Sequence, residues 1–179
     1  MKLGFFPTKI ERIIFNGEEI LIKRDDLTEL IASGNKIRKL EYFFYEAKKE
    51  KVNKVVTCGG IQSNHARATA YLSRKLGFEP VLFLRGEPKL PYEGNLFLDY
   101  LFGAEIHYVT REEYKEIDKI MEEYKNSEDK KGNKAFIIPE GGSDELGVWG
   151  YVDAISEMKE FILKNKIDAI FCAVGSGGT

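Results

Sequence analysis

The chain has 179 residues, 43% hydrophobic and 31% charged, with a formal net charge of −2, which is typical of a globular chain of one domain or slightly more. It has no basic stripe and no apolar run near the roughly 20 residues that a membrane helix needs, so we expect neither nucleic acid nor a membrane as a partner. Two cysteines without CxxC spacing indicate a reducing compartment, and we expect a cytoplasmic protein.

The first predicted elements are two short strands joined by a hairpin turn. Ile13-Ile14-Phe15 and Ile20-Leu21-Ile22 flank Asn16-Gly17, a dipeptide typical of tight turns between antiparallel strands. A charged connection follows and leads to the next element, a helix.

This helix is predicted to start at Asn35, a good N-cap after the permissive Gly34, and to reach about Lys51. Its apolar stripe, counted back by helical steps, begins at Lys36; the stripe consists of Leu40, Phe43, Phe44 and Ala47. Burial lowers the pKa of an amine from about 10.4 and makes it a usable nucleophile or Schiff-base former. The alternative is that Lys36 reaches solvent and Lys39 is an ordinary surface charge.

The rest of the chain alternates strands and helices, which predicts βαβ units and a twisted parallel sheet, an α/β fold. The predicted strands are 52–57, 81–84, 106–109, 135–139 and 167–174; the predicted helices are 64–76, 94–102, 111–124 and 143–164, with a polar loop at 126–133. The chain stops after a strand and a glycine loop, where a covering helix ought to follow. We therefore expect the N-terminal part of a larger fold, or a second polypeptide that completes it.

Three loops follow predicted strands, at the sheet edge where open α/β folds bind ligands. In Cys58-Gly59-Gly60-Ile61-Gln62-Ser63-Asn64-His65, Ser63 or Asn64 begins a helix, whose N-terminus favours an anion; alternatively, Ser63 only caps that helix. Pro139-Glu140-Gly141-Gly142-Ser143 reads as a strand-to-helix connection. Gly175-Ser176-Gly177-Gly178-Thr179 can wrap a phosphate with backbone N–H groups and hydroxyls.

A buried lysine, a polar anion-facing loop and a phosphate-binding glycine loop together indicate one cofactor. Pyridoxal 5′-phosphate carries a phosphate and binds lysine as an imine. The two histidines and two cysteines have no metal-ligand spacing, so no metal is expected.

These motifs resemble those of the 1-aminocyclopropane-1-carboxylate deaminase / D-cysteine desulfhydrase family. The resemblance rests on Gly34-Asn35-Lys36-x-x-Lys39-Leu40-Glu41-Tyr42, Gly59-Gly60-Ile61-Gln62-Ser63-Asn64-His65 and the terminal glycine loop. It implies a pyridoxal-phosphate-dependent, tryptophan-synthase-β-like fold (fold type II) of three-layer twisted parallel sheets. Residues 1–47 and 144–179 would belong to an incomplete large domain, and 48–143 to a smaller inserted one.

The resemblance also implies residue roles. Lys36 would form the imine, Lys39 would lie near the phosphate, and Ser63 would contact the substrate and act in proton removal or nucleophilic attack. Asn64 would hydrogen-bond the ring hydroxyl, and Gly175, Ser176, Gly177, Gly178 and Thr179 would cup the phosphate. The substrate carboxylate would lie against the first loop, through Gly60, Gln62, Ser63, Asn64 and His65.

The activity that the resemblance favours is that of a D-cysteine desulfhydrase, which converts D-cysteine to pyruvate, sulfide and ammonia. The reason is His65 after Asn64, since cyclopropane deaminases more often have Gln there; ring opening of 1-aminocyclopropane-1-carboxylate to 2-oxobutanoate and ammonia is the alternative. A homodimer is implied, and 179 residues alone are expected to be inactive. Two other hypotheses are a non-catalytic phosphate- or nucleotide-binding domain and a serine hydrolase using Ser63 and His65.

Overall fold

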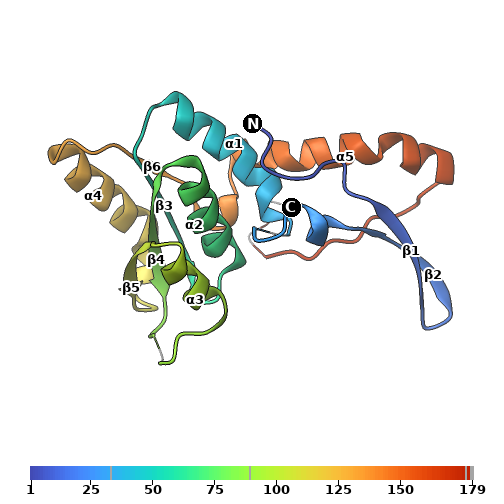
Figure 1. Ribbon diagram of the computed structural model, residues 1–179. Helices are drawn as coiled ribbons and strands as arrows, with labels where there is room; N and C mark the ends of the chain where they lie inside the picture. The colour runs from blue at the N-terminus through green and yellow to red at the C-terminus, as the bar shows by residue number, and fades with distance from the viewer. Residues whose placement is uncertain (33, 89, 176, 178–179) are drawn as a thin grey trace.

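The computed structural model describes residues 1–32, 34–88, 90–175 and 177. A two-stranded antiparallel ribbon of β1 (Ile10–Phe15) and β2 (Glu18–Lys23) stands at one end of the molecule (Figure 1). Asn16 and Gly17 both have positive φ, 51° and 85°, as a tight hairpin turn requires. The hairpin prediction is confirmed.

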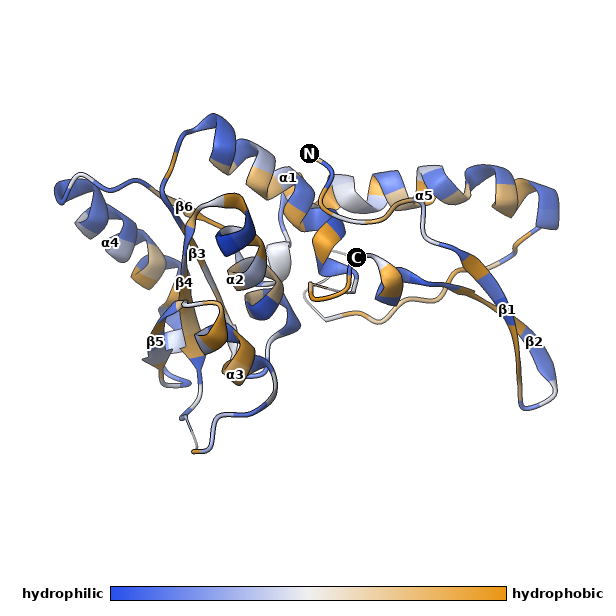
Figure 2. Ribbon diagram, viewed as in Figure 1, coloured by the Kyte–Doolittle hydropathy of each residue, from blue (hydrophilic) through white to orange (hydrophobic). Residues whose placement is uncertain are grey.

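A four-stranded parallel sheet forms the other end of the molecule. Its strand order is β5-β4-β3-β6; the bounds are β3 Lys54–Gly60, β4 Glu79–Arg85, β5 Glu105–Val109 and β6 Ala135–Ile137. Much of β3 and β4 is hydrophobic in Figure 2, as expected for strands covered on both faces. The α/β prediction is confirmed.

Helices cover both faces of this sheet and give three layers. Helix α4 (Ile117–Lys130), which follows a short 3₁₀ turn at Glu113–Glu116, packs on Val56 and Val81. Helices α2 (Asn64–Leu76) and α3 (Gly94–Leu101) pack on Leu82 and Leu84 of the opposite face. All of these elements lie inside 48–143, while the division of the chain into two domains stays a prediction.

Helix α4 extends farther than predicted, and the predicted loop at 126–133 is wrong for its first half. Residues up to Lys130 are helical because Glu128, which is 3% exposed, anchors the last turn. Its carboxylate pairs with Lys54 at 3.0 Å and with Lys131 at 2.7 Å. The polar residues at the end of α4 are therefore helical and held by ion pairs around the buried Glu128, and do not form a loop.

Helix α1 (Lys36–Lys49) joins the sheet to the rest of the molecule. Its predicted apolar stripe is buried, with Leu40, Phe43, Phe44 and Ala47 each at most 1% exposed. The stripe packs on Val55, Ala68 and Leu72 of the sheet layer. On the other side, α1 crosses the long helix α5 (Glu145–Asn165) (Figure 1).

Gly150 allows α1 and α5 to pack closely where they cross. A Cβ built on Gly150 would lie 2.5 Å from the backbone carbonyl of Arg38 and 2.8 Å from the amide of Lys39. The glycine in α5 thus lets the backbones of the two helices meet. As a result, α5 lies directly behind the turn of α1 that carries Lys39.

The predicted last strand, 167–174, is not formed. Residues 167–174 follow α5 without regular secondary structure, and Phe171 and Val174 are 94% and 77% exposed. An isolated segment cannot form a strand because its backbone groups need a partner ladder, and the described residues offer it none. Cys172, which lies in this segment, is therefore exposed.

None of the described helices combines the length and the apolar character that a bilayer-spanning segment requires.

Candidate active site

Two loops and one helix start converge at the carboxyl end of the sheet. Strands β3 and β6 are direct neighbours, with Val56 opposite Ile137. The loop after β3 leads into α2, and a 3₁₀ turn at Glu140–Gly142 follows β6. Both loops face the first turns of α1, where the two predicted lysines lie.

Lys39 is buried between these elements. Its side chain is 1% exposed, and its Nζ donates to the Gly141 carbonyl at 3.1 Å and to Ser143 Oγ at 2.9 Å. Burial, followed by the nearby charge of Lys36, lowers the pKa of Lys39 to about 8, against a smaller opposing effect of Asp144. The alternative that Lys39 is an ordinary surface charge is wrong.

Lys36 lies half-buried at the head of the apolar stripe, and desolvation lowers the pKa of its amine. The positive charge of Lys36 lowers the pKa of both Lys39 and His65, so the three side chains lie in one region. Asn35 precedes it at the N-cap position but makes no capping bond with its side chain; instead, its amide donates to Tyr151 Oη at 2.6 Å. The predicted capping role of the Asn35 side chain is wrong.

Ser63 caps α2, as the simpler interpretation predicted. Its Oγ accepts from the amide of Ala66 at 3.1 Å. Gly59 makes room for it, since a Cβ at Gly59 would lie 2.7 Å from Ser63 Oγ. Ser63 remains partly exposed, so capping does not preclude the predicted contact with substrate.

His65 lies beneath the loop rather than on it. The ring is 3% exposed, and Nε2 is 2.9 Å from Thr57 Oγ1, which donates to the Ile138 carbonyl at 2.8 Å. Burial, then the charges of Lys36 and Lys39, lower the pKa of His65 to about 3, so the ring is neutral. The ring thus supports the loop from below through Thr57, and its predicted contact with the substrate stays a prediction.

The outer part of the same loop is exposed and fastened to α3. Gln62 and Asn64 both hydrogen-bond Asn95, the second residue of α3. Next to them, a Cβ at Gly60 would meet nothing within 4 Å. The loop therefore has free space above Gly60 while its polar side chains are held from one side.

The terminal glycine loop is described only in part. Gly175 and Gly177 are exposed, and Gly177 has a φ of 79°. Ser176, Gly178 and Thr179 lie outside the described residues. The predicted phosphate contacts of this loop stay a prediction.

Sequence reasoning missed the partners that hold Lys39. The sequence predicts only a strand-to-helix connection at Gly141 and Ser143, although a glycine pair with a serine directly after a strand is the same signal as in the first loop. Tyr151 was missed because it lies far along the chain, on α5, with the Lys39 Nζ 5.8 Å from its ring centre.

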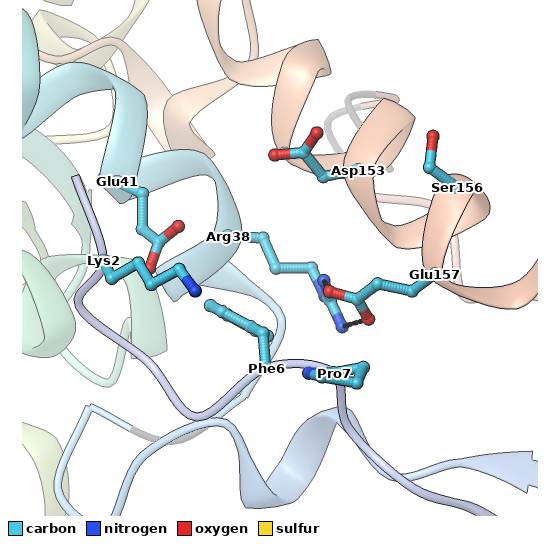
Figure 3. Close-up of a pocket in the computed structure, with 9 residues that line it drawn as sticks. Lys2, Phe6, Pro7, Arg38, Glu41, Asp153, Ser156 and Glu157 are labelled. Atoms are coloured by element: carbon cyan, nitrogen blue, oxygen red, sulfur yellow. Dashed lines mark hydrogen bonds and ion pairs between the residues drawn. The ribbon is translucent and has the colours of Figure 1, made fainter.

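A cavity beside α1 lies away from these lysines. A space of about 410 Å³ lies between the N-terminal segment, α1 and α5 (Figure 3). Arg38 borders it, yet its guanidinium is already paired with Glu157 at 2.9 Å and covers the Phe6 ring. Neither Lys36 nor Lys39 lines it, so we assign this space to helix packing.

The residues around Lys36 and Lys39 fit a phosphate-bearing aldehyde. Two lysines with lowered pKa lie together, and within the described part of the chain Lys39 bonds only neutral oxygens. A lysine amine with a lowered pKa can attack a carbonyl carbon. The positive charge of the two lysines and the N-terminus of α2 favour an anion. No cluster of potential metal ligands occurs among the described residues.

Comparison with known proteins gives one family. The family described as "pyridoxal-phosphate dependent enzyme" matches residues 2–179. A putative 1-aminocyclopropane-1-carboxylate deaminase of Thermotoga maritima is 58% identical over 163 residues, which are 91% of this chain and 52% of the relative. A mitochondrial bifunctional D-cysteine desulfhydrase/1-aminocyclopropane-1-carboxylate deaminase of Arabidopsis thaliana is 42% identical, over 99% of this chain and 48% of the relative.

A solved structure agrees with these relatives. The crystal structure of an ACC deaminase homologue superposes with a TM-score of 0.85 at 36% identity, covering 98% of this chain and 55% of that one. The chain thus spans about half the length of the proteins that it matches.

Proposed function

Because the chain belongs to the pyridoxal-phosphate dependent enzyme family, we propose that it supplies the lysine-bearing part of a D-cysteine desulfhydrase-like lyase. The enzyme would convert D-cysteine to pyruvate, sulfide and ammonia. The observation that carries this proposal is the pair of close, desolvated lysines at the head of α1. The cofactor supplies the electron sink that stabilises negative charge on the carbon next to the amino group.

Each side chain has a distinct task in this proposal. Lys36 holds the cofactor covalently, Lys39 compensates the phosphate charge, and Asn64 bonds the ring hydroxyl. Ser63 contacts the substrate and moves a proton or attacks, and the space above Gly60 and beside Gln62 takes the carboxylate. His65 supports the loop from below through Thr57. The loop at 175–179 cups the phosphate.

The first test of this proposal is reductive trapping. Treating the protein with pyridoxal phosphate and borohydride should attach the cofactor irreversibly to Lys36, as peptide mass mapping would show. In Lys36→Ala the label should disappear. The matched control is Lys39→Ala, which removes the neighbouring lysine of the same helix turn; there the label should stay on Lys36 while cofactor affinity falls. Labelling at any residue but Lys36 would contradict the assignment.

1-Aminocyclopropane-1-carboxylate deaminase activity is the second candidate, favoured by the name of the relative at 58% identity. Since His65 is buried, the residue after Asn64 acts on substrate choice only indirectly. In the full-length protein, we expect sulfide and pyruvate from D-cysteine to exceed 2-oxobutanoate from the cyclopropane amino acid. Predominant 2-oxobutanoate formation would reverse the choice, and no turnover with a colourless protein would favour a non-catalytic phosphate-binding domain.

We further propose a cytoplasmic homodimer. An exposed free thiol at Cys172 fits a reducing compartment. A dimer is implied by the family resemblance, and the exposed apolar residues Val148, Trp149 and Val152 of α5 offer a surface for association. Sedimentation analysis measures the oligomeric state, and a monomer at all concentrations would refute the dimer.

The serine hydrolase hypothesis has no support in the geometry. Ser63 Oγ is engaged with the Ala66 amide, and His65 Nε2 with Thr57. Within the described residues no hydrogen bond joins Ser63 to His65, as a nucleophile–base pair requires.

A further inference from the structure

Three side-chain amides form one hydrogen-bonded cluster at the junction of the first loop and α3. The backbone N–H of Asn95 donates to Gln62 Oε1 at 2.8 Å, and Asn95 Nδ2 donates both to the Gln62 carbonyl at 2.8 Å and to Asn64 Oδ1 at 2.9 Å. Gln62 Nε2 in turn donates to the Glu93 carbonyl at 3.2 Å. Asn95 is the centre of this cluster.

The orientation of the Asn95 amide is set by groups whose roles cannot be exchanged. A backbone carbonyl only accepts, so the atom of Asn95 facing the Gln62 carbonyl must be Nδ2. A guanidinium only donates, so the atom facing Arg67 Nη1, at 3.4 Å, must be Oδ1. Two independent partners therefore assign the same orientation, which in an isolated amide would be ambiguous.

This orientation determines that of Asn64 as well. Because Asn95 presents a donor, Asn64 has to turn its Oδ1 toward α3. The amide group is planar, so Nδ2 of Asn64 then points away from α3. Asn64 is the first residue of α2 and is exposed, so this second donor group is available to a ligand.

We propose that Asn95 is a positioning residue, which holds the Asn64 amide so that it offers an N–H donor, and not a carbonyl, to the ring oxygen of the bound cofactor. The inference rests on the proposed function for the identity of that ligand. An ionised ring hydroxyl is stabilised by a donor and repelled by a carbonyl oxygen. With the amide reversed, the same asparagine would weaken binding.

The variant that tests this is Asn95→Asp. A carboxylate cannot donate to Asn64 Oδ1 but can accept from Asn64 Nδ2, so the amide of Asn64 reverses. Asn95→Ala is the matched control, because it also loses the bond to the Gln62 carbonyl but imposes no orientation on Asn64. The difference between the two variants therefore reports the orientation, beyond any loosening of the loop.

Spectroscopic titration with pyridoxal phosphate gives the first readout. We expect Asn95→Asp to weaken cofactor affinity about tenfold or more, and clearly more than Asn95→Ala does. In an Asn64→Ala background, Asn95→Asp and Asn95→Ala should have equal effects. If Asn95→Asp is no worse than Asn95→Ala, or remains worse after Asn64 is removed, the proposal is overturned.

Side-chain amide exchange measured by NMR without cofactor gives the second readout. In the unchanged protein the Nδ2 protons of Asn95 should exchange more slowly than those of Asn64; in Asn95→Asp one proton of Asn64 should become protected. An unaltered Asn64 signal would overturn the positioning claim. Failure of the unchanged protein to bind pyridoxal phosphate would contradict the proposed function instead. The exchange measurement would still determine the orientation of the Asn64 amide.

Discussion

At the scale of single residues, the informative feature is the cost of placing Lys39 where it is. The Lys39 cation is 1% exposed and bonded to a carbonyl and a hydroxyl; among the described residues no carboxylate forms an ion pair with it, as one usually does with a buried lysine. Selection for stability alone would favour an apolar residue at position 39. The sequence keeps a destabilising amine next to a second one, which is typical of a functional site.

The lowered pKa of Lys39 predicts a pH dependence of stability. Its folded pKa is about 8 and its unfolded pKa about 10.4, so between these values the unfolded state binds more protons and stability rises with pH. Relative to Lys39→Met, the unchanged chain should gain up to about 3 kcal/mol between about pH 7 and about pH 10. Urea unfolding at both pH values measures this gain.

Lys48→Met is the control for this prediction, since Lys48 is an exposed lysine on the same helix. It should follow the pH profile of the unchanged chain. An identical slope in Lys39→Met and the unchanged chain would show that the folded pKa of Lys39 is not lowered.

At the scale of elements, the crossing of α1 and α5 determines where the lysines lie. Gly150 lets the backbone of α5 touch the turn of α1 that carries Arg38 and Lys39. Tyr151, the next residue, reaches Asn35. Two helices distant in sequence thus jointly fix the head of α1.

Replacing Gly150 by alanine should separate the two helices. The added Cβ would meet the Arg38 backbone at 2.5 Å, and backbone cannot move aside as a flexible side chain can, so we expect a loss of about 2 kcal/mol or more. Chemical denaturation measures the loss. Ser156→Ala, at an exposed position of the same helix, should change stability by less than about 0.5 kcal/mol; equal effects of both substitutions would contradict the close crossing.

At the scale of the whole molecule, Arg38 joins segments that are far apart in the chain. Its guanidinium is 2% exposed and pairs with Asp25 at 2.7 Å and with Glu157 at 2.9 Å. Figure 3 shows Arg38 of α1 facing Glu157 of α5 above Phe6. Burial alone would raise the pKa of Asp25 and Glu157, but the bonds from Arg38 outweigh it, and both pKa values are lowered.

Arg38→Met should therefore destabilise the chain by about 3 kcal/mol near neutral pH, because two partly buried carboxylates lose their partner. A carboxylate with a lowered folded pKa contributes stability above its unfolded pKa and loses it as pH falls through the folded value. The gap between Arg38→Met and the unchanged chain should accordingly shrink below about pH 4. Denaturation curves across this range test it, and a gap independent of pH would contradict the assigned pairing.

Several local features could be predicted from the sequence, and others could not. The hairpin at Asn16-Gly17, the stripe behind Lys36 and the start of α2 at Asn64 depend on neighbouring residues, and all three are as predicted. The predicted helix end at Tyr124 and the predicted strand at 167–174 are wrong, because each structure depends on contacts with residues distant in the sequence. Glu128 forms an ion pair with Lys54, whereas residues 167–174 pair with no strand among the described residues.

The amino-acid sequence is enough to predict the α/β order of elements, the motifs that carry the family resemblance and the lysine at the head of an apolar stripe. These follow from backbone preference and hydrophobic periodicity, which act over a few residues. Contacts between distant segments place Lys39 against Gly141, His65 under its loop and Asn95 beside Asn64. The reason is that desolvation and hydrogen-bond direction depend on which segments meet in space, and no local pattern encodes that meeting.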